Sequence, residues 1–381
     1  MKNGVARLAI LCPGFGRVMR GVETLTGELS SYLTQSATDW EIDIFCRGPT
    51  KRLSDKVRQI HVPAVDRNSR LATLYAQFGH RMGIFLRTRI DAECLSFTLA
   101  LAPRILYSHY DVVFNQAGPF AGALLKLKRK LDGTPFVHAT ASGYSDLELV
   151  MARQRPNVIL ANSPFVKDWL ANNFPDLRIE CVPNAVDCSV FRPYSQEELA
   201  ALKDKIAIFN LKKPIVLFVG AIDPMKRPEL LIRAVAQLDN VSLAMVGSGR
   251  IEPEIVRLGS KLLDGRFLHI PVVSREQIAA YYNACDLFTL PSEEPFGSVF
   301  LEAMACNKPV LVHRSPVQDW IFGDAGETCD CTNVIEYAHA IQRLISSDFG
   351  TRPLMRSRAF DWTVVGPQYA RLLREVAESR G

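Results

Sequence analysis

A chain of 381 residues is too long for one typical hydrophobic core, and it predicts two domains of roughly 150 to 200 residues each. Its 22% charged and 48% hydrophobic residues are ordinary for a soluble globular protein. The nine cysteines form no Cys-x-x-Cys pair, which argues against a zinc ribbon or a disulfide framework and indicates a reducing compartment. No run approaches the ~18 to 20 apolar residues of a membrane span, and the first apolar run is too short for a signal peptide. We therefore expect a cytoplasmic protein.

The net charge of +5 is unevenly distributed along the chain. Residues 1–190 hold 23 Lys and Arg against 17 Asp and Glu, a net of +6, whereas the remainder holds 22 against 23, a net of −1. Residues 47–104 hold 11 basic against 4 acidic side chains. One interpretation is an ordinary solvated helical face. The other is attraction to an anionic partner, such as a phosphorylated acceptor or the inner face of the cell membrane, to which the protein would bind peripherally.

In the first half of the chain, short apolar runs that end in Gly, Asn or Ser alternate with amphipathic stretches. The runs predict strands within 7–14, 41–48, 111–118, 135–143 and 157–163. The amphipathic stretches 22–35 and 121–131 predict helices. Strands that alternate with helices indicate βαβ units and a parallel sheet.

The pattern restarts after a proline-punctuated segment at 181–195, and the join between the domains is expected near 184–193. Five more strands are expected within 214–222, 241–249, 266–273, 286–292 and 309–315. The fold class is therefore α/β, with two Rossmann-like, doubly wound parallel-sheet domains. Because ligands bind beyond the carboxyl ends of such strands, we expect the two domains to face each other across a cleft.

The stretch 290–312 places two glutamates around a tight turn. Glu294 falls in the loop beyond an expected strand, and Glu302 lies one turn into the following helix, on the same face as Ser298. The backbone N–H groups of Gly297, Ser298 and Val299 form a helix N-terminus, which attracts anions. Two acceptors beside a patch of donors suit a ligand that is a polyol at both ends and anionic in the middle, such as a nucleotide sugar.

Residues 291–310 resemble the Glu-x7-Glu signature of the retaining GT-B glycosyltransferases of the family 4 type, which include bacterial mannosyl- and glucosyltransferases and sucrose synthase. "VGAIDPMKRPELLIRAV" and "AMVGSGR" are similar to the Gly-rich turns of that family's donor domain, and "VPNAVDCSVFRP" is similar to its interdomain segment. The last helix resembles the family's helix that crosses back to the first domain. The resemblance implies an acceptor-side domain at 1–190, a donor domain at 191–358 and a returning helix at 359–381.

The resemblance also implies roles for individual residues. Glu294 would stabilise positive charge near the anomeric carbon, Lys226 would neutralise the diphosphate leaving group, and Glu302 would bind the ribose hydroxyls. The other donor-side residues implied are Gly14, Gly16, Arg227, Pro271, Val272, Phe296, Gly297, Ser298 and Val299. No Asp-x-Asp follows a strand, so we expect no metal ion, and no cofactor besides the nucleotide-sugar substrate.

The chain departs from the family's pattern at three places. Ala221 holds the position of the usual diphosphate-binding arginine, and the alternatives for that role are Arg17, Arg20 and Arg227. The usual Gly-Gly of the first loop reads Arg-Gly, and the usual His-Gly after the fourth strand reads Ser-Gly. The candidates on the acceptor or sugar side are therefore Arg20, Gly21, Ser142, Gly143 and the nearby strand histidine His138.

The expected function is metal-independent, retaining transfer of a hexose from a UDP- or GDP-sugar to a glycan, lipid-linked or small-molecule acceptor, in cell-envelope or exopolysaccharide biosynthesis. No nucleic-acid partner is expected. One alternative is a non-catalytic nucleotide-sugar-binding protein, since the usual Arg and His are replaced. The other is an NADP-dependent oxidoreductase, with Arg47 at a 2′-phosphate position, although Met19 occupies the third glycine position of the dinucleotide fingerprint.

Overall fold

The computed structural model describes residues 5–18, 20–37, 39–82 and 88–379. The chain forms two compact units: Met1–Asn184 together with Val365–Gly381, and Ala185–Val364. Each observed division lies six residues from the expected one, at 184 against 190 and at 364 against 358. Met19, on which the dinucleotide alternative depends, lies outside the described residues.

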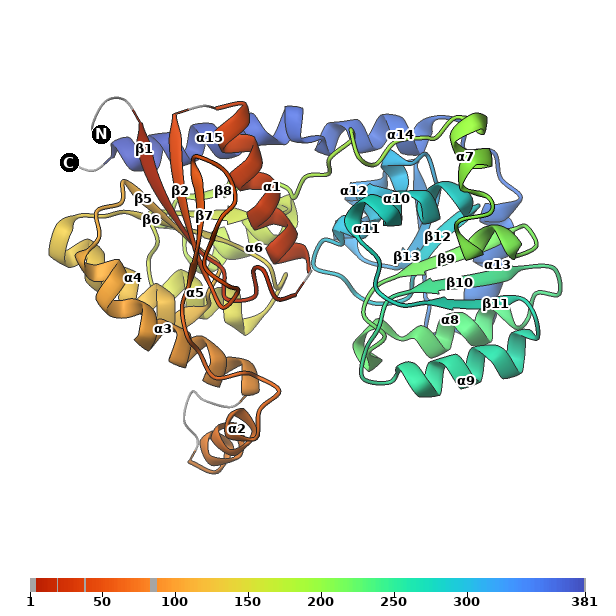
Figure 1. Cartoon of the computed structure of the whole chain (residues 1–381), viewed down its shortest axis with the longest axis horizontal. Helices are drawn as coiled ribbons and strands as arrows, with labels where there is room; N and C mark the ends of the chain where they lie inside the picture. Colours follow the sequence, from red (N-terminus) through yellow and green to blue (C-terminus); the bar gives the residue numbers. More distant parts are fainter. Residues whose placement is uncertain (1–4, 19, 38, 83–87, 380–381) are drawn as a thin grey trace. The chain divides into compact units, whose positions relative to one another are not determined.

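The first unit is built on an eight-stranded sheet with helices on both faces (Figure 1). Its strands are β1 (Ala6–Leu11), β2 (Trp40–Cys46), β3 (Lys51–Arg52), β4 (Val57–His61), β5 (Val112–Asn115), β6 (Phe136–Ala139), β7 (Val158–Ala161) and β8 (Ile179–Cys181). Its helices are α1 (Gly21–Gln35), α2 (Arg70–Met82), α3 (Arg89–Tyr107), α4 (Pro119–Asp132), α5 (Asp146–Arg153), α6 (Pro164–Asn173) and most of α15 (Trp362–Glu378).

The strand order of this sheet is β3-β4-β2-β1-β5-β6-β7-β8, and all pairs except β3 with β4 are parallel. Ala6 pairs with Trp40 on one side of β1, and Leu8 pairs with Val112 on the other. The chain therefore runs outward from β1 and returns to its other side at β5. The first sheet is doubly wound, as expected.

Alternate residues of the strands supply the cores on the two faces of this sheet. Ala9 and Leu11 of β1 pack with Phe97 and Leu101 of α3. On the opposite face, Gly366 of α15 lies directly against the ring of Tyr32 in α1. Figure 1 accordingly shows α1 and α15 on one side of the sheet and α3 and α4 on the other.

The terminal helix α15 begins in the second unit and continues into the first. Arg178 donates to Glu375 at 2.8 Å, and the Arg374 guanidinium lies 4.8 Å from the centroid of the Trp40 ring. At its start, the Trp362 N–H donates to the Val186 carbonyl at 3.2 Å. The last helix therefore passes from the second unit into the first, which includes Val365–Gly381.

The second unit is built on a six-stranded parallel sheet of order β11-β10-β9-β12-β13-β14. Its strands are β9 (Ile215–Val219), β10 (Ser242–Val246), β11 (Phe267–Ile270), β12 (Leu287–Leu290), β13 (Val310–His313) and β14 (Gly326–Cys329). Its helices are α7 (Gln196–Leu202), η1 (Ala207–Asn210), η2 (Pro224–Lys226), α8 (Pro228–Val235), α9 (Glu252–Leu263), α10 (Arg275–Ala284), α11 (Ser298–Ala305), α12 (Pro316–Phe322), α13 (Val334–Ile345), α14 (Arg352–Ser357) and η3 (Arg358–Phe360).

Figure 1 shows α8 and α9 on one face of this sheet and α10, α11 and α12 on the other. The five strands expected here coincide with β9 to β13. Four strands of the protein were not expected from the sequence: β3, β4, β8 and β14. They lie at or next to the outer ends of the sheets and mix apolar with charged or polar residues, so they show no continuous apolar run.

A close backbone contact joins the loops that follow β9 and β10. A Cβ atom added at Gly247 would lie 1.9 Å from the Gly220 carbonyl oxygen, and its φ of +142° is a conformation that side chains rarely allow. The two loops can lie this close only because Gly247 has no side chain.

Gly247→Ala is expected to destabilise the protein by about 2 kcal/mol or more, because the new methyl group meets backbone that has no free direction to move. Gly265→Ala is the matched control, since Gly265 also has a positive φ of +72° but no atom within 4 Å of the added Cβ. The control should lose only about 1 kcal/mol. Urea denaturation of both variants measures the difference, and equal losses would contradict the close-contact explanation.

Candidate functional site

The most favourable ligand position in the second unit is the edge of the sheet where β9 and β12 lie side by side. From β9 the chain proceeds to β10 and β11 on one side, and from β12 it proceeds to β13 and β14 on the other. Two loops therefore diverge beyond the carboxyl ends of neighbouring strands, an arrangement that binds ligands in many open α/β sheets. The loop after β9 carries Lys226, and the loop after β12 carries Glu294.

These two residues form an ion pair across that position. The Lys226 Nζ lies 2.5 Å from Glu294 Oε1, and the Ser292 hydroxyl donates to the same oxygen at 2.5 Å. Gln318 of α12 donates to the Glu294 carbonyl at 2.8 Å, which fixes the backbone of the loop. The side chains of Lys226 and Glu294 remain 28% and 11% exposed. The structure thus places the side chains of Lys226 and Glu294, both predicted as site residues, next to each other.

The helix α11 begins immediately after this loop, at Gly297. Gly297 is in the left-handed region with φ +84°, and a Cβ atom there would lie 2.2 Å from the Phe300 ring. Only glycine fits, so the turn and the helix start are fixed together. Ser298 and Val299 are the first residues of α11. The first N–H groups of a helix have no acceptor within the helix, so the N–H groups of these two residues can donate to an anion.

Phe296, expected on the donor side, is buried and packs against Phe360 with ring centroids 6.2 Å apart. Its carbonyl oxygen accepts a bond from Gln318 at 3.3 Å. The side chain therefore anchors the signature loop on the core. A direct contact between the Phe296 ring and a ligand would require this packing to open.

Glu302 lies in α11 and is buried. Arg275 donates to its Oε1 at 3.1 Å and the Tyr282 hydroxyl donates to its Oε2 at 2.9 Å. Burial raises the pKa of Glu302 above its ordinary value, although the Arg275 charge and the bond from Tyr282 oppose that change. Both carboxylate oxygens therefore already have a donor.

Arg227 is the first residue after Lys226 and has two unusual features. Its backbone is in the left-handed region, with φ +50° and ψ +42°. Its Nη2 donates to Glu293 at 3.1 Å, whereas its Nη1 is buried and has no hydrogen-bond partner among the described residues. A buried donor without an acceptor costs about 1 to 3 kcal/mol. Ala221, at the position of the family's usual arginine, lies in the same loop.

The residues expected to contact the nucleobase lie after β11, and the glycines expected to contact the phosphates lie after β1. Pro271 and Val272 follow β11 and are exposed. In the first unit, Gly14 and Gly16 lie in the turn after β1, and the exposed residues Arg20 and Gly21 begin α1. Of the alternative arginines, Arg17 pairs with Asp66 at 3.3 Å.

His138 is a buried residue of β6. Its Nε2 lies 2.7 Å from Glu148 Oε2, and its Nδ1 lies 3.2 Å from the Asn115 carbonyl oxygen. The N–H groups of Ala141 and Ser142 donate to the other oxygen of Glu148 at 2.9 and 2.8 Å. Burial by itself would raise the pKa of Glu148, but His138 and these backbone donors outweigh it and hold the pKa below its ordinary value.

The buried Glu148 thus fixes the loop that holds Ser142 and Gly143, and Gly143 has a φ of +62°. The site residues expected on the acceptor or sugar side differ in their exposure to solvent: Ser142 is partly exposed and Gly143 is buried. Arg20 and Gly21 are exposed. His138 lies in the core, which agrees with an ordinary sheet histidine.

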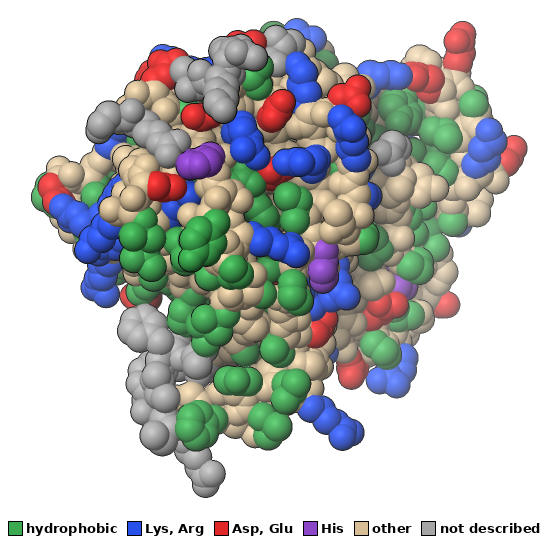
Figure 2. All heavy atoms as spheres, turned by 60° about the vertical axis from the view of Figure 1, so that its left-hand side comes forward, with side chains coloured by type: hydrophobic (Ala, Val, Ile, Leu, Met, Phe, Trp, Pro, Cys, Tyr) green, Lys and Arg blue, Asp and Glu red, His purple; other side chains and the backbone are tan. Residues whose placement is uncertain are grey.

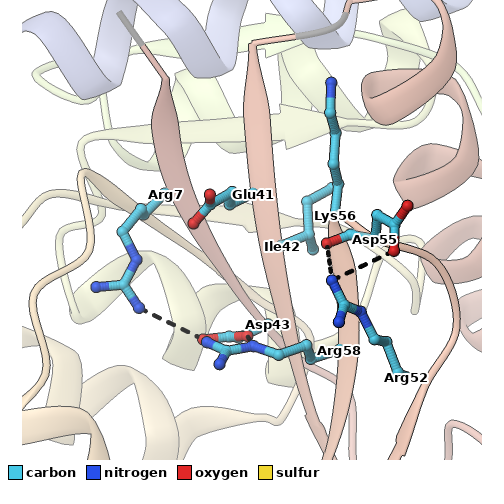
Figure 3. A pocket seen from close by; sticks show the side chains of 8 residues that line it. All are labelled: Arg7, Glu41, Ile42, Asp43, Arg52, Asp55, Lys56 and Arg58. Carbon is cyan, nitrogen blue, oxygen red and sulfur yellow. Dashed lines mark hydrogen bonds and ion pairs between the residues drawn. The ribbon is translucent and has the colours of Figure 1, made fainter. Parts of the chain in front are cut away.

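A polar hollow of about 420 Å³ lies near the opposite, amino ends of β1, β2 and β4 (Figure 3). At its centre the buried Asp43 accepts two bonds from Arg58, at 2.7 and 2.8 Å, and one from the Tyr110 hydroxyl at 2.8 Å. Arg7 Nη2 lies 3.7 Å from the same carboxylate. The single carboxylate of Asp43 thus pairs with both arginines, and the hollow lies away from the carboxyl ends where ligands of such sheets bind.

Sequence reasoning missed the residues that hold the two glutamates: Ser292, Gln318, Arg275 and Tyr282. Arg275 follows a strand and could have been suspected on that ground, but no spacing rule links Gln318 or Tyr282 to residues 20 or more positions away. Within the described ranges, no group of three or more His, Cys, Asp or Glu side chains is placed to hold a metal ion.

Two family models match the chain, one in each half. The model "Glycosyl transferases group 1" matches residues 201–362, and the model "Glycosyltransferase Family 4" matches residues 19–190. A D-inositol 3-phosphate glycosyltransferase of Mycolicibacterium smegmatis is 40% identical over 143 residues, which are 35% of this chain and 32% of that relative. A D-inositol 3-phosphate glycosyltransferase of Nocardioides is 28% identical, with 96% of this chain and 88% of the relative covered.

Solved structures resemble the whole chain. Sucrose-phosphate synthase from Thermosynechococcus elongatus superposes with a TM-score of 0.77 at 20% identity, covering 98% of this chain and all of that one. Anabaena HepE in complex with UDP and glucose superposes with a TM-score of 0.72 at 18% identity, covering 97% of this chain and 99% of that one. At these identities the likeness concerns the fold: two α/β domains of the GT-B class.

Proposed function

Because the chain belongs to the group 1 and family 4 glycosyltransferases, we propose that it transfers a hexose from a UDP- or GDP-sugar to an acceptor hydroxyl with retention at the anomeric carbon. The acceptor is a glycan, a lipid-linked sugar or a small molecule, and the process is cell-envelope or exopolysaccharide biosynthesis. The reaction needs no metal ion and no cofactor. The single observation that carries the proposal is the Lys226–Glu294 pair at the junction of β9 and β12.

In this reaction the bond between the anomeric carbon and the diphosphate breaks, and a bond from that carbon to the acceptor oxygen forms. The nucleoside diphosphate leaves with additional negative charge, and its departing oxygen takes up the proton that the acceptor hydroxyl loses. The Lys226 ammonium is placed to stabilise the departing diphosphate. The Glu294 carboxylate stabilises the positive charge that develops at the anomeric carbon.

The elements around this pair suit the rest of a nucleotide sugar. The N-terminus of α11 at Gly297, Ser298 and Val299 offers donors to the diphosphate. Glu302 lies one turn further along the same helix and is assigned to the ribose hydroxyls, which requires the ribose to share or replace its bonds from Arg275 and Tyr282. Pro271 and Val272 are assigned to the nucleobase. The HepE structures contain UDP with glucose, or UDP-glucose, which supports a nucleotide-sugar donor.

Arg227 is assigned to the diphosphate, in place of the arginine that the chain lacks at Ala221. Its left-handed backbone costs about 1 to 2 kcal/mol relative to glycine, and its buried Nη1 lacks an acceptor. A ligand oxygen beside Nη1 would satisfy that donor. Strain and an unpaired donor at one residue support a role in ligand binding.

The proposal is tested by offering UDP-, GDP- and ADP-sugars to the protein in the presence of EDTA. A donor that binds should raise the thermal midpoint, since a ligand at 100 times its dissociation constant adds about 2.7 kcal/mol of stability. Release of free nucleotide should then require an acceptor. If a nucleotide sugar binds but no acceptor leads to release of free nucleotide, the non-catalytic alternative is favoured. If no nucleotide sugar binds, the proposal is overturned.

Lys226→Ala is expected to lower turnover by roughly 10²-fold or more, as the loss of one preorganised electrostatic group does. Lys226→Met, which keeps the apolar stem, should do no better if the charge is what matters. Lys213→Met is the matched control, because Lys213 is also ion-paired, to Asp286 at 2.8 Å, but precedes the first residue of β9. Near-normal turnover in both Lys226 variants would assign the leaving group to another cation.

Arg227→Gly should weaken binding of the nucleoside diphosphate at least tenfold, because hydrogen bonds to charged groups contribute about 1.5 to 3 kcal/mol. The same change should leave the stability of the free protein unchanged or higher, since glycine adopts the left-handed backbone without strain. Calorimetric titration with UDP and GDP and a thermal melt measure the two effects.

The control for Arg227→Gly is Asp264→Gly, an exposed residue with a positive φ of +22° in the same unit. It should change stability without changing nucleotide affinity. Wild-type affinity in Arg227→Gly would leave Arg17 and Arg20 as the candidates for the diphosphate.

A further inference from the structure

Helix α2 of the first unit presents its apolar side chains in an unusual direction. Its small residues Ala72 and Gly79 are buried, on the side that packs against α3. Its bulky apolar residues point to solvent: Leu71 is 59% exposed, Leu74 60%, Tyr75 48% and Phe78 60%. A surface helix normally buries its bulky apolar residues and exposes polar ones, so α2 has the reverse arrangement.

The four exposed side chains, named here the α2 stripe, form one continuous face. They occupy positions i, i+3, i+4 and i+7, which lie on the same side of a helix over about 10 Å of its length. Figure 1 shows α2 at the outer end of the first unit, away from the sheet, and Figure 2 shows hydrophobic side chains gathered on the lower part of this side of the molecule. An exposed apolar face of this kind marks an interaction surface.

The charge around the α2 stripe is of one sign. Between Asp66 and Asp91 the sequence holds five arginines and no acidic residue, and one of the five, Arg67, is paired with Glu93. Arg70, at the start of α2, and Arg89, at the start of α3, are both exposed. Two other arginines of the basic region are paired with carboxylates: Arg47 with Glu93 at 2.7 Å and Arg58 with Asp43 at 2.7 Å. The unequal charge of the first half of the chain is therefore concentrated at α2.

We propose that the α2 stripe is a docking surface for an anionic lipid bilayer, into whose headgroup region α2 inserts its apolar face while arginines contact the lipid phosphates. An amphipathic helix with bulky apolar residues on one face and arginines beside it binds membrane surfaces in this way. A second copy of the chain is disfavoured as the occupant, because it would bring the same excess of arginine to the contact. No helix of the described residues is long and apolar enough to cross a bilayer.

This docking does not depend on the transferase function, so the two can fail separately. The test is sedimentation of the full chain with vesicles of phosphatidylcholine alone or with 30% phosphatidylglycerol, at low and high salt. Wild-type protein should bind the anionic vesicles, and the binding should weaken with salt. Leu74→Gln combined with Phe78→Gln should lower the partition coefficient at least tenfold, because the apolar contact is lost. Arg70→Gln, which removes one positive charge, should lower the partition coefficient roughly fivefold.

The matched control is Leu131→Gln combined with Ile335→Gln, which removes two equally exposed apolar residues from α4 and α13. It should bind vesicles like wild type. Circular dichroism and the thermal shift with the donor should be unchanged in both double variants, since neither touches the candidate site. Equal binding by the two double variants, or no preference for anionic lipid, would overturn the proposal. Concentration-dependent dimerisation that the α2 variant abolishes without lipid would assign the stripe to a second copy instead.

Discussion

The ion pair between Lys226 and Glu294 depends on the adjacency of two strands that are far apart in the sequence. The two residues are 68 positions apart, yet the parallel pairing of β9 with β12 brings their loops to the same edge of the sheet. Ser292 and Gln318 then fix the glutamate, and Gly247 lets the neighbouring loop lie directly against the β9 loop. The pairing of β9 with β12 and the bonds to Glu294 thus hold one cation and one carboxylate 2.5 Å apart at a partly exposed position.

Two buried carboxylates elsewhere in the protein, those of Asp43 and Glu148, are satisfied by their neighbours. Asp43 accepts from Arg58 and Tyr110, and Glu148 accepts from His138 and two backbone N–H groups. Such groups are locked, because removing either partner would leave a buried charge unpaired. Arg227 differs, since one of its buried nitrogens has no acceptor and its backbone is strained. Among the described residues, Arg227 alone combines a buried side-chain atom that has no hydrogen-bond partner with a left-handed backbone.

The first unit likewise contains arginines that are bound to carboxylates and a surface that lies outside those ion pairs. Arg47, Arg58 and Arg67 are bound to carboxylates, so much of the positive charge in this region is structural. The α2 stripe and the exposed residues Arg70 and Arg89 remain outside that network. The proposed donor site and the proposed lipid contact therefore belong to different units, each with its own core and its own exposed groups.

The sequence by itself determined the two doubly wound sheets, ten of the strands and the signature around Glu294 and Glu302. Hydrophobic periodicity, turn residues and short motifs indicate these features, and all three are local properties of the chain. It did not reveal β3, β4, β8 and β14, whose pairing partners rather than apolar runs make them strands. It placed Glu302 correctly on its helix but not the bonds from Arg275 and Tyr282. The spacing of Leu71, Leu74, Tyr75 and Phe78 indicates an apolar face, and only the packing of Ala72 and Gly79 toward α3 turned that face to solvent. Contacts between distant segments decide such features, since the energy of burial depends on what the fold brings alongside.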